Sequence, residues 1–226
     1  MMNDYVVGLS YSDRLRLATT ARHQAMQEWF GSELAMLTSL MGPMSEGPEW
    51  PASAAWLGVR RGQNACIISD GLSDPWVDRH QGDNGLGLEV FIESPDVELT
   101  SNTPLTQLAD TWLFPMLAEI SHTLAGFPRL STRLLAGELL SLELNIDHIK
   151  DGRNISGVLL SLQKLPVISL SPDSNATVRL VSATLLSPAE VIYLRGKGVS
   201  GRQILADKLQ VAGIMHLSLL KRPSLV

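Results

Sequence analysis

The segment Gly71-Leu72-Ser73-Asp74-Pro75 is the part of this chain that comes closest to a catalytic motif. In a nucleophile elbow with the pattern GxSxG, two glycines permit a sharp turn that exposes the serine hydroxyl for attack on a carbonyl. Pro75 stands in place of the second glycine, and the residues after it lack the pattern of a helix. Asp78 and His80 lie nearby in the chain, so a serine-type hydrolase that uses Ser73 and His80 is one hypothesis.

Other chemistry-bearing residues do not form a recognisable reactive site. The stretch 196–201 has the letters GxGxxG of a dinucleotide-binding loop, but it follows a predicted helix, whereas that motif requires a preceding strand. Glu89 and Glu93 share a strand face about 13 Å apart, farther than the carboxylate pairs of glycosidases. Cys66 lies in a predicted buried strand and is expected to be a core residue. We therefore predict no catalytic residue and no cofactor.

The histidines do not predict a metal site either. None of them stands at the HxxxH or HExxH spacing that places two imidazoles on one helix face. We expect each to be a surface residue or a hydrogen-bonded one, and we predict that the chain binds no metal. The five are His23, His80, His122, His148 and His216.

The composition is that of an ordinary folded domain. The chain has 226 residues, 45% of them hydrophobic and 18% charged, which predicts one sizeable core in a single domain over 1–226. Cys66 is the only cysteine, which indicates a reducing compartment. The sequence shows no signal-peptide pattern and no long apolar run, so we expect a cytoplasmic protein that does not enter a membrane.

Charge is distributed unevenly along the chain. Residues 67–100 contain eight acids and Arg79 as the one base, a balance of −7. Residues 195–226 contain six bases and Asp207 as the one acid, a balance of +5. A solvated acidic region repels phosphate backbones and attracts basic proteins. No basic patch is interleaved with aromatic residues, so we do not expect nucleic-acid binding.

Hydrophobic periodicity and turn residues indicate the elements that must position the segment around Ser73. We expect residues 1–42 to form an N-terminal helical segment that packs on the rest of the domain. In order, we expect a helix over 12–41 broken at Gly31-Ser32, a hairpin with strands at 55–59 and 65–69, a loop over 70–84, and a strand over 86–93 with one apolar face and one mixed face.

The second half has helices and short strands without a regular βα repeat. Ser187-Pro188-Ala189-Glu190 is a strong helix start, because the hydroxyl and the carboxylate can each satisfy a free backbone N–H. Helices before, between and after hairpin-linked strands predict an α+β fold, with a mainly antiparallel or mixed sheet flanked by helices. The expected elements are a helix from 103 restarted at Pro115 and ending at Gly126, a short helix near 128–136, strands at 140–146, 158–162, 166–170, 177–185 and 214–219, and two helical pieces joined at 196–198.

Two blocks of the sequence resemble the core signature of the suppressor-of-fused (SUFU) domain family. In that family a strand ends in Ser-x-Gly-Leu-Ser-Asp/Glu, and after a loop a second strand carries Gly-aromatic-Gly-aromatic-Glu. This chain departs from the pattern at Leu86 and Leu88, where the family commonly has aromatic residues, so it resembles distant, bacterial-type members. The resemblance extends over about residues 50–210, and the matching residues are Ser69, Gly71, Leu72, Ser73, Asp74, Gly85, Gly87 and Glu89.

This resemblance implies a SUFU-like α+β fold and a non-enzymatic, protein-binding role. Stand-alone bacterial relatives include immunity proteins that neutralise toxins, and the family's partner peptide joins the sheet as an added strand, as exposed sheet edges permit. We therefore predict an immunity or regulatory protein that sequesters a basic toxin domain or an extended peptide added to a sheet edge. A third hypothesis is a homodimer, in which the basic C-terminal region docks on the acidic loop. The predicted partner-binding residues are Asp70, Ser73, Asp74, Trp76, Asp78, Asp83 and Glu89.

Overall fold

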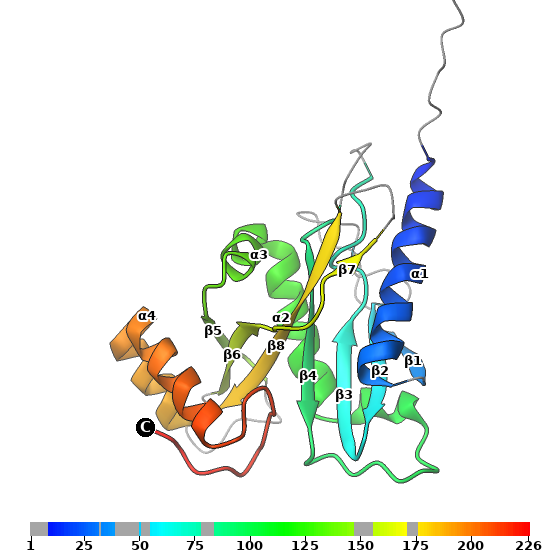
Figure 1. Ribbon diagram of the computed structural model, residues 1–226. Coiled ribbons are helices and arrows are strands. Elements are labelled where there is room, and N and C mark those ends of the chain that lie inside the picture. Colours follow the sequence, from blue (N-terminus) through cyan, green and yellow to red (C-terminus); the bar gives the residue numbers. More distant parts are fainter. Residues whose placement is uncertain are drawn as a thin grey trace, which may run out of the picture.

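In the computed structural model, a mixed sheet of eight strands is flanked by helices, which confirms the α+β class predicted from the sequence (Figure 1). The structure describes residues 9–31, 33–38, 50, 55–77, 84–146, 156–170 and 176–226. Its helices are α1 (Tyr11–Phe30), the 3-10 helix η1 (Leu105–Asp110), α2 (Leu113–Gly126), α3 (Pro128–Leu135) and α4 (Pro188–Val211). Its strands are β1 (Leu34–Leu37), β2 (Trp56–Arg61), β3 (Asn64–Ser69), β4 (Leu88–Ser94), β5 (Leu140–Leu144), β6 (Ser156–Leu162), β7 (Ile168–Ser169) and β8 (Thr177–Leu186).

The sheet has the strand order β1-β2-β3-β4-β8-β6-β5, and β7 pairs with β8 beside this path. β4 and β8 are parallel neighbours, whereas the other described pairs are antiparallel. The parallel pairing runs from Leu88 opposite Arg179 to Phe91 opposite Ser182. The sheet therefore joins two antiparallel halves, β1 to β4 and β5 to β8, through one parallel seam.

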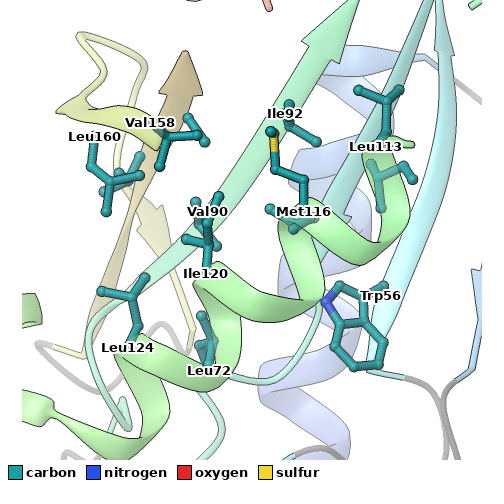
Figure 2. Close-up of a cluster of buried hydrophobic side chains, with 14 of the residues drawn as sticks. Trp56, Leu72, Val90, Ile92, Leu113, Met116, Ile120, Leu124, Val158 and Leu160 are labelled. Carbon is teal, nitrogen blue, oxygen red and sulfur yellow. The ribbon is translucent and has the colours of Figure 1, made fainter. Parts of the chain in front are cut away.

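Strand β4 lies at the centre of the sheet and is covered on both faces. On one face Val90 and Ile92 pack against Met116 of α2 in the main hydrophobic core (Figure 2). On the other face the ring of Phe91 meets the ring of Phe30 on α1, with 5.1 Å between centroids. Because both faces are covered, every residue of β4 is buried.

The mixed face predicted for the 86–93 strand is therefore covered as well. Glu89 is 0% exposed and Glu93 is 2% exposed, although a strand with one charged face is typical of a sheet that meets water. A buried carboxylate must be paired with donors or cations inside the protein. The two glutamates thus indicate where the structure concentrates its buried polar contacts.

The N-terminal region differs from the helix expected over 12–41. Helix α1 has Ser10 as its N-cap and ends at Gly31, which confirms the predicted break. A Cβ at Gly31 would lie 2.8 Å from the carbonyl oxygen of Arg60, so a side chain would not fit where the chain approaches β2. The prediction that the helix resumes after this break is wrong for Leu34–Leu37, which pairs with β2 and forms the edge strand β1.

Several other expected elements are confirmed. The β2–β3 hairpin turns at 62–63, and α2 begins at Leu113 with Pro115 in its first turn, close to the predicted restart. The piece before it, expected to begin at 103, is the short 3-10 helix η1. Helix α4 begins with a complete capping box formed by Ser187 and Glu190, and its backbone is non-helical at Gly198. These features depend on contacts within a few residues, which is why the sequence reveals them.

The prediction of a strand at 214–219 is wrong. This segment consists of turns, with one isolated parallel bridge between Leu217 and Glu93 of β4. Ile214 packs against the hydrophobic cluster beneath α4, and the segment does not extend the sheet over several residues.

Candidate functional site

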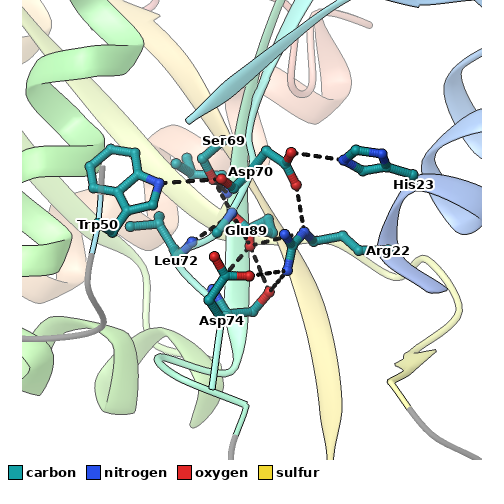
Figure 3. Close-up of polar contacts among 11 residues, drawn as sticks. Arg22, His23, Trp50, Ser69, Asp70, Leu72, Asp74 and Glu89 are labelled. Carbon is teal, nitrogen blue, oxygen red and sulfur yellow. Dashed lines mark hydrogen bonds and ion pairs between the residues drawn. The ribbon is translucent and has the colours of Figure 1, made fainter. Parts of the chain in front are cut away.

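The two sequence blocks that carry the SUFU resemblance meet around the carboxylate of Glu89 (Figure 3). This carboxylate accepts hydrogen bonds from the hydroxyls of Ser69 at 2.5 Å and of Ser73 at 2.6 Å. It also accepts from the backbone N–H groups of Gly71 and Ser73 at 3.0 Å and of Leu72 at 3.3 Å. Because Glu89 is wholly buried, these donors replace the water that a carboxylate would otherwise bind. Glu89 thereby holds the turn that follows β3.

Arg22 of α1 brings a positive charge to the same place. Its Nε lies 2.6 Å from Asp70 and 3.7 Å from Glu89, and its Nη1 lies 2.9 Å from Asp74. Nη1 also donates to the Ser73 hydroxyl at 3.2 Å. The Arg22 side chain is 1% exposed, so water does not screen these ion pairs. We call Arg22, Asp70, Ser73, Asp74 and Glu89 the buried cluster.

Burial and charge act against each other on the pKa values of the buried cluster. Burial alone would lower the pKa of Arg22, but the three carboxylates outweigh it and hold that pKa above its ordinary value. Burial alone would raise the pKa of Asp70, but Arg22 and His23 outweigh it, so the Asp70 pKa is lowered. For Asp74 and Glu89 burial is the larger influence, and both pKa values are raised. Arg22 and Asp70 therefore form the ionised centre of the cluster.

Two further side chains surround the carboxylate and carbonyl of Asp70. Nε2 of His23 lies 2.8 Å from Asp70 Oδ2, and the His23 side chain is partly exposed. Nε1 of Trp50 donates to the Asp70 carbonyl at 3.4 Å. Trp50 is fully buried and packs edge-on against Trp56, with 5.0 Å between ring centroids. Asp70 thus connects α1 to the aromatic part of the core.

Gly85, the first glycine of the second signature block, occupies a position where a side chain would not fit. It has φ +53°, and a Cβ there would lie 2.5 Å from the carbonyl oxygen of Asp74 and 2.6 Å from that of Leu72. The next residue, Leu86, donates its N–H to Leu72 at 2.8 Å. The two blocks therefore approach each other backbone to backbone, which a residue without a side chain permits.

The structure corrects the expectation that the acids of this region form a solvated negative surface. The side chains of Asp70, Ser73, Asp74 and Glu89 are buried, and Arg22 neutralises part of their charge. The reason is that α1 covers this face of the sheet, which the charge count along the sequence does not reveal. In this conformation these four side chains support the fold from inside.

The other three predicted partner-binding residues are placed differently. Trp76 is partly buried, and its Nε1 donates to the carbonyl of Gly85 at 3.3 Å. Asp78 and Asp83 lie outside the described residues. Partner binding through any of the seven predicted residues stays a prediction.

The hydrolase hypothesis required Ser73 within reach of an imidazole. The Ser73 hydroxyl is 0% exposed and donates to Glu89, and it accepts from Arg22. A nucleophilic serine instead donates to a histidine and faces the substrate. His80 lies outside the described residues. The hydroxyl of Ser73 is therefore committed to a carboxylate that lies deep in the fold.

The sequence interpretation missed Arg22, which lies 48 residues before Asp70. A signal for it exists in the chain. The buried residues of α1 are spaced by four, and a cation occupies one position of this otherwise apolar stripe. An arginine on the buried face of a helix must meet a carboxylate or another acceptor inside the protein. The stripe consists of Ala18, Arg22, Met26 and Phe30.

A second buried carboxylate lies two pleats farther along β4. Glu93 accepts from Arg61 at 2.6 Å and from Asn64 at 2.7 Å, and its Oε2 lies 3.0 Å from Nε2 of His216. Burial alone would raise the pKa of Glu93, but the contacts with His216, Asn64 and Arg61 outweigh it and lower that pKa to about 2. Glu93 therefore links the hairpin to the C-terminal segment.

The described residues contain no group of three or more His, Cys, Asp or Glu side chains arranged to hold a metal ion. Among the helices that the structure describes, none is long and apolar enough to cross a membrane.

Comparison with known proteins gives a likeness in structure but not in sequence. No family model matches the chain, and no curated protein matches it. The structure is similar to the crystal structure of a protein from Neisseria gonorrhoeae described as a homologue of SUFU, the suppressor of fused protein. The TM-score is 0.51 at 18% sequence identity, and the match covers 95% of this chain and 98% of the other. The chain thus has a SUFU-like fold, which confirms the predicted fold.

Proposed function

We propose that this chain is a non-enzymatic protein-binding module of the SUFU type, which sequesters a partner protein as an immunity or regulatory protein. The observation that carries the proposal is the buried cluster within a SUFU-like fold. Its serine, carboxylates and arginine, the groups best suited to catalysis, are used to brace a turn and a helix. A scaffold braced in this way can present a surface without reacting groups. The single, buried Cys66 supports a reducing, cytoplasmic setting for such a protein.

The sheet edge at β1 is the surface that we assign to the partner. β1 and β5 are the two terminal strands of the sheet order, and an extended peptide can pair with a terminal strand through its backbone. Beside β5, Arg195 of α4 holds Glu143 through two hydrogen bonds. β1 carries no such clamp among the described residues, and its Met36 is 64% exposed. An extended segment of the partner would therefore add to β1 and cover Met36.

The experiment starts with capture of the partner on the purified full chain from lysate of the source cells, followed by titration of the purified partner. Met36→Lys places a charge on the β1 edge and should weaken binding by about tenfold or more. Val199→Lys makes the same change at an exposed apolar residue of α4 and should leave the affinity unchanged. No saturable partner, or equal affinity in both variants, contradicts this proposal.

The charge of the partner can be tested separately at Asp78 and Asp83. If the partner is a basic toxin domain, the double change Asp78→Lys and Asp83→Lys should lower the association rate, and salt should reduce the difference. An unchanged rate at low salt favours an extended, uncharged peptide segment as the element recognised.

The hydrolase hypothesis makes an opposite prediction for Ser73→Ala. If Ser73 were the catalytic nucleophile, its replacement by alanine would abolish any esterase or peptidase activity of the purified chain. On our proposal the purified chain has no such activity, and Ser73→Ala lowers stability by about 1 to 2 kcal/mol, because the hydroxyl loses its hydrogen bonds to Glu89 and from Arg22. Loss of a measured hydrolytic activity in a folded Ser73→Ala variant would contradict the proposal.

A further inference from the structure

The last residues of the chain occupy an opening in the sheet. We call residues 214–226 the C-terminal strap. Strands β4 and β8 pair in parallel only as far as Phe91 and Ser182. Beyond that point the strap passes between their ends (Figure 1). It therefore fills the place where the two halves of the sheet separate.

The contacts of the strap reach both strands. The N–H of Ser218 donates to the carbonyl of Glu93 on β4 at 2.8 Å. On the β8 side the Ser218 hydroxyl accepts from the N–H of Leu185 at 2.9 Å and donates to the carbonyl of Ala183 at 3.0 Å. Ser218 is fully buried. The opening thus holds the strap through defined hydrogen bonds to both strands.

The strap and the opening are complementary in charge. Nε2 of His216 lies 3.0 Å from Glu93, and Arg222 donates two hydrogen bonds to Glu190 at the start of α4. The side chains of Arg222 and Glu190 are 4% and 0% exposed. Asp96 accepts from a strap N–H at 2.6 Å. Acidic side chains on the body therefore face the guanidinium of Arg222 and a backbone N–H donor on the strap.

A strained hinge connects the strap to α4. Gly213 has φ +70°, and Met215 has φ +50°. Met215 is the one non-glycine residue with positive φ among those that the structure describes. A left-handed backbone is unfavourable for a residue with a Cβ, because the Cβ approaches the following carbonyl. The strap is therefore folded back onto its own body against a local backbone preference.

An exposed apolar stripe continues α4 into this hinge. Ile204, Val211 and Met215 are 45%, 91% and 56% exposed. Their spacing of seven and then four residues would place them on one face if the helix ran on through residue 215. Two residues of this stripe also line a groove of about 490 Å³. The lining residues are Ile204, Asp207, Lys208, Val211, Ala212 and Leu225.

We propose that the C-terminal strap exchanges between two copies of this chain. In the exchanged dimer α4 extends through the hinge, and each strap enters the opening of the other copy. The same hydrogen bonds and the same Arg222–Glu190 ion pair form in both states, so they do not decide between them. Release of strain at Met215 and burial of the apolar stripe between the two helices favour the dimer. This self-association goes beyond the proposed binding of a partner protein and does not depend on it.

The hinge glycine provides the test, because the two states need different backbones at residue 213. Gly213→Ala strains the folded-back state and favours a continuous helix, so it should tighten dimerisation about fivefold per hinge. Gly137→Ala is the matched control. Gly137 also has a left-handed backbone and open space for a Cβ, but it follows α3, far from the strap in the chain. Light scattering over a concentration series should show more dimer in Gly213→Ala alone.

Two further variants act in the opposite direction. Met215→Gly relieves the strain of the folded-back state, and Val211→Ser removes an exposed methyl pair from the stripe. Both should lower the dimer fraction, and Val211→Ser should do so without a change in the melting temperature of the monomer. An exchanged dimer must release both straps to dissociate, so an isolated dimer fraction should persist on re-injection.

Three outcomes would overturn the exchange. Gly213→Ala could stay monomeric at every attainable concentration, or it could dimerise no more than Gly137→Ala. A dimer that dissociates within seconds of dilution would be a surface contact without exchanged straps. Each of these results leaves the proposed partner binding intact, since that is measured by titration with the partner.

Discussion

The guanidinium of Arg22 lies 2.6 Å from the carboxylate of Asp70, although 48 residues separate them in the chain. Both side chains are almost wholly buried, at 1% and 5% exposure. This contact fixes α1 to the turn after β3. Glu89 of the central strand holds the same turn by accepting hydrogen bonds from its backbone N–H groups. The N-terminal helix is thereby part of the same structural unit as the signature blocks.

Replacing Arg22 should destabilise the protein strongly. Arg22→Met keeps much of the side-chain volume but leaves three buried carboxylates without their cation, which should cost about 3 to 5 kcal/mol in the free energy of unfolding. Urea denaturation followed by tryptophan fluorescence measures this loss. Arg16→Met, at an exposed pair with Asp13 on the same helix, should change stability by well under 1 kcal/mol. Equal losses in the two variants would show that the buried cluster does not brace the fold.

The close approach of the two signature blocks predicts different costs for two glycine substitutions. Gly85→Ala places a Cβ against two backbone carbonyls, at 2.5 and 2.6 Å, so the turn must move. Gly62→Ala introduces the same left-handed strain, but its Cβ meets nothing within 4 Å. We expect a loss of about 1 kcal/mol for Gly62→Ala and of about 3 kcal/mol or more for Gly85→Ala. Thermal or urea unfolding of both variants decides this, and similar losses would contradict the close approach.

The low pKa of Glu93 predicts how stability depends on pH. The ordinary value of 4.5 is lowered to about 2 in the folded protein. Ionised Glu93 therefore stabilises the fold fully above about pH 4.5, and this stabilisation is lost as the pH falls toward 2. Wild type should exceed Glu93→Gln in unfolding free energy by about 2 to 3 kcal/mol at pH 6, and the difference should shrink toward pH 2.

This difference isolates Glu93 from the other carboxylates. The raised pKa values of Asp74 and Glu89 make their protonation favour the folded state, but they contribute equally to wild type and to Glu93→Gln. Urea unfolding of both proteins from pH 2 to 6 provides the measurement. A difference that is constant across this range would mean that Glu93 does not titrate below its ordinary value.

The thiol of Cys66 should be protected in the folded protein. Burial raises its pKa well above the ordinary value, the nearby Glu93 raises it further, and Arg61 opposes them only in part. Since the thiolate is the reactive form and the side chain is 0% exposed, a thiol reagent should react only as fast as the protein unfolds. Native labelling should speed up in parallel with unfolding as urea is added. Labelling of the native protein as fast as in 6 M denaturant would contradict this.

Several features could be predicted because neighbouring residues determine them. The capping box at Ser187 and Glu190, the restart of the chain near Pro115 and the break at Gly31 each depend on contacts within a few positions. The burial of Cys66 follows from the apolar residues beside it in β3. The SUFU-like fold could be predicted from the resemblance of the two signature blocks, because their residues form a local turn and a strand.

Other features could not be predicted from local pattern. The same four-residue apolar run at 34–37 fits a helix or an edge strand, and only its pairing with β2 selects the strand. The apolar residues at 214–219 suggested a strand, but the opening between β4 and β8 accepts a segment of turns with one bridge. In both cases a partner distant in the chain decided the conformation.

The sequence by itself determined the α+β class, most element boundaries and the two blocks that distinguish this chain. Only the tertiary structure decided what those blocks do. Acids that look like a solvated surface when counted along the chain become an internal brace once α1 lays Arg22 over them. The physical reason is that a carboxylate's role depends on its burial and its counter-charge, and both come from residues far away in the sequence.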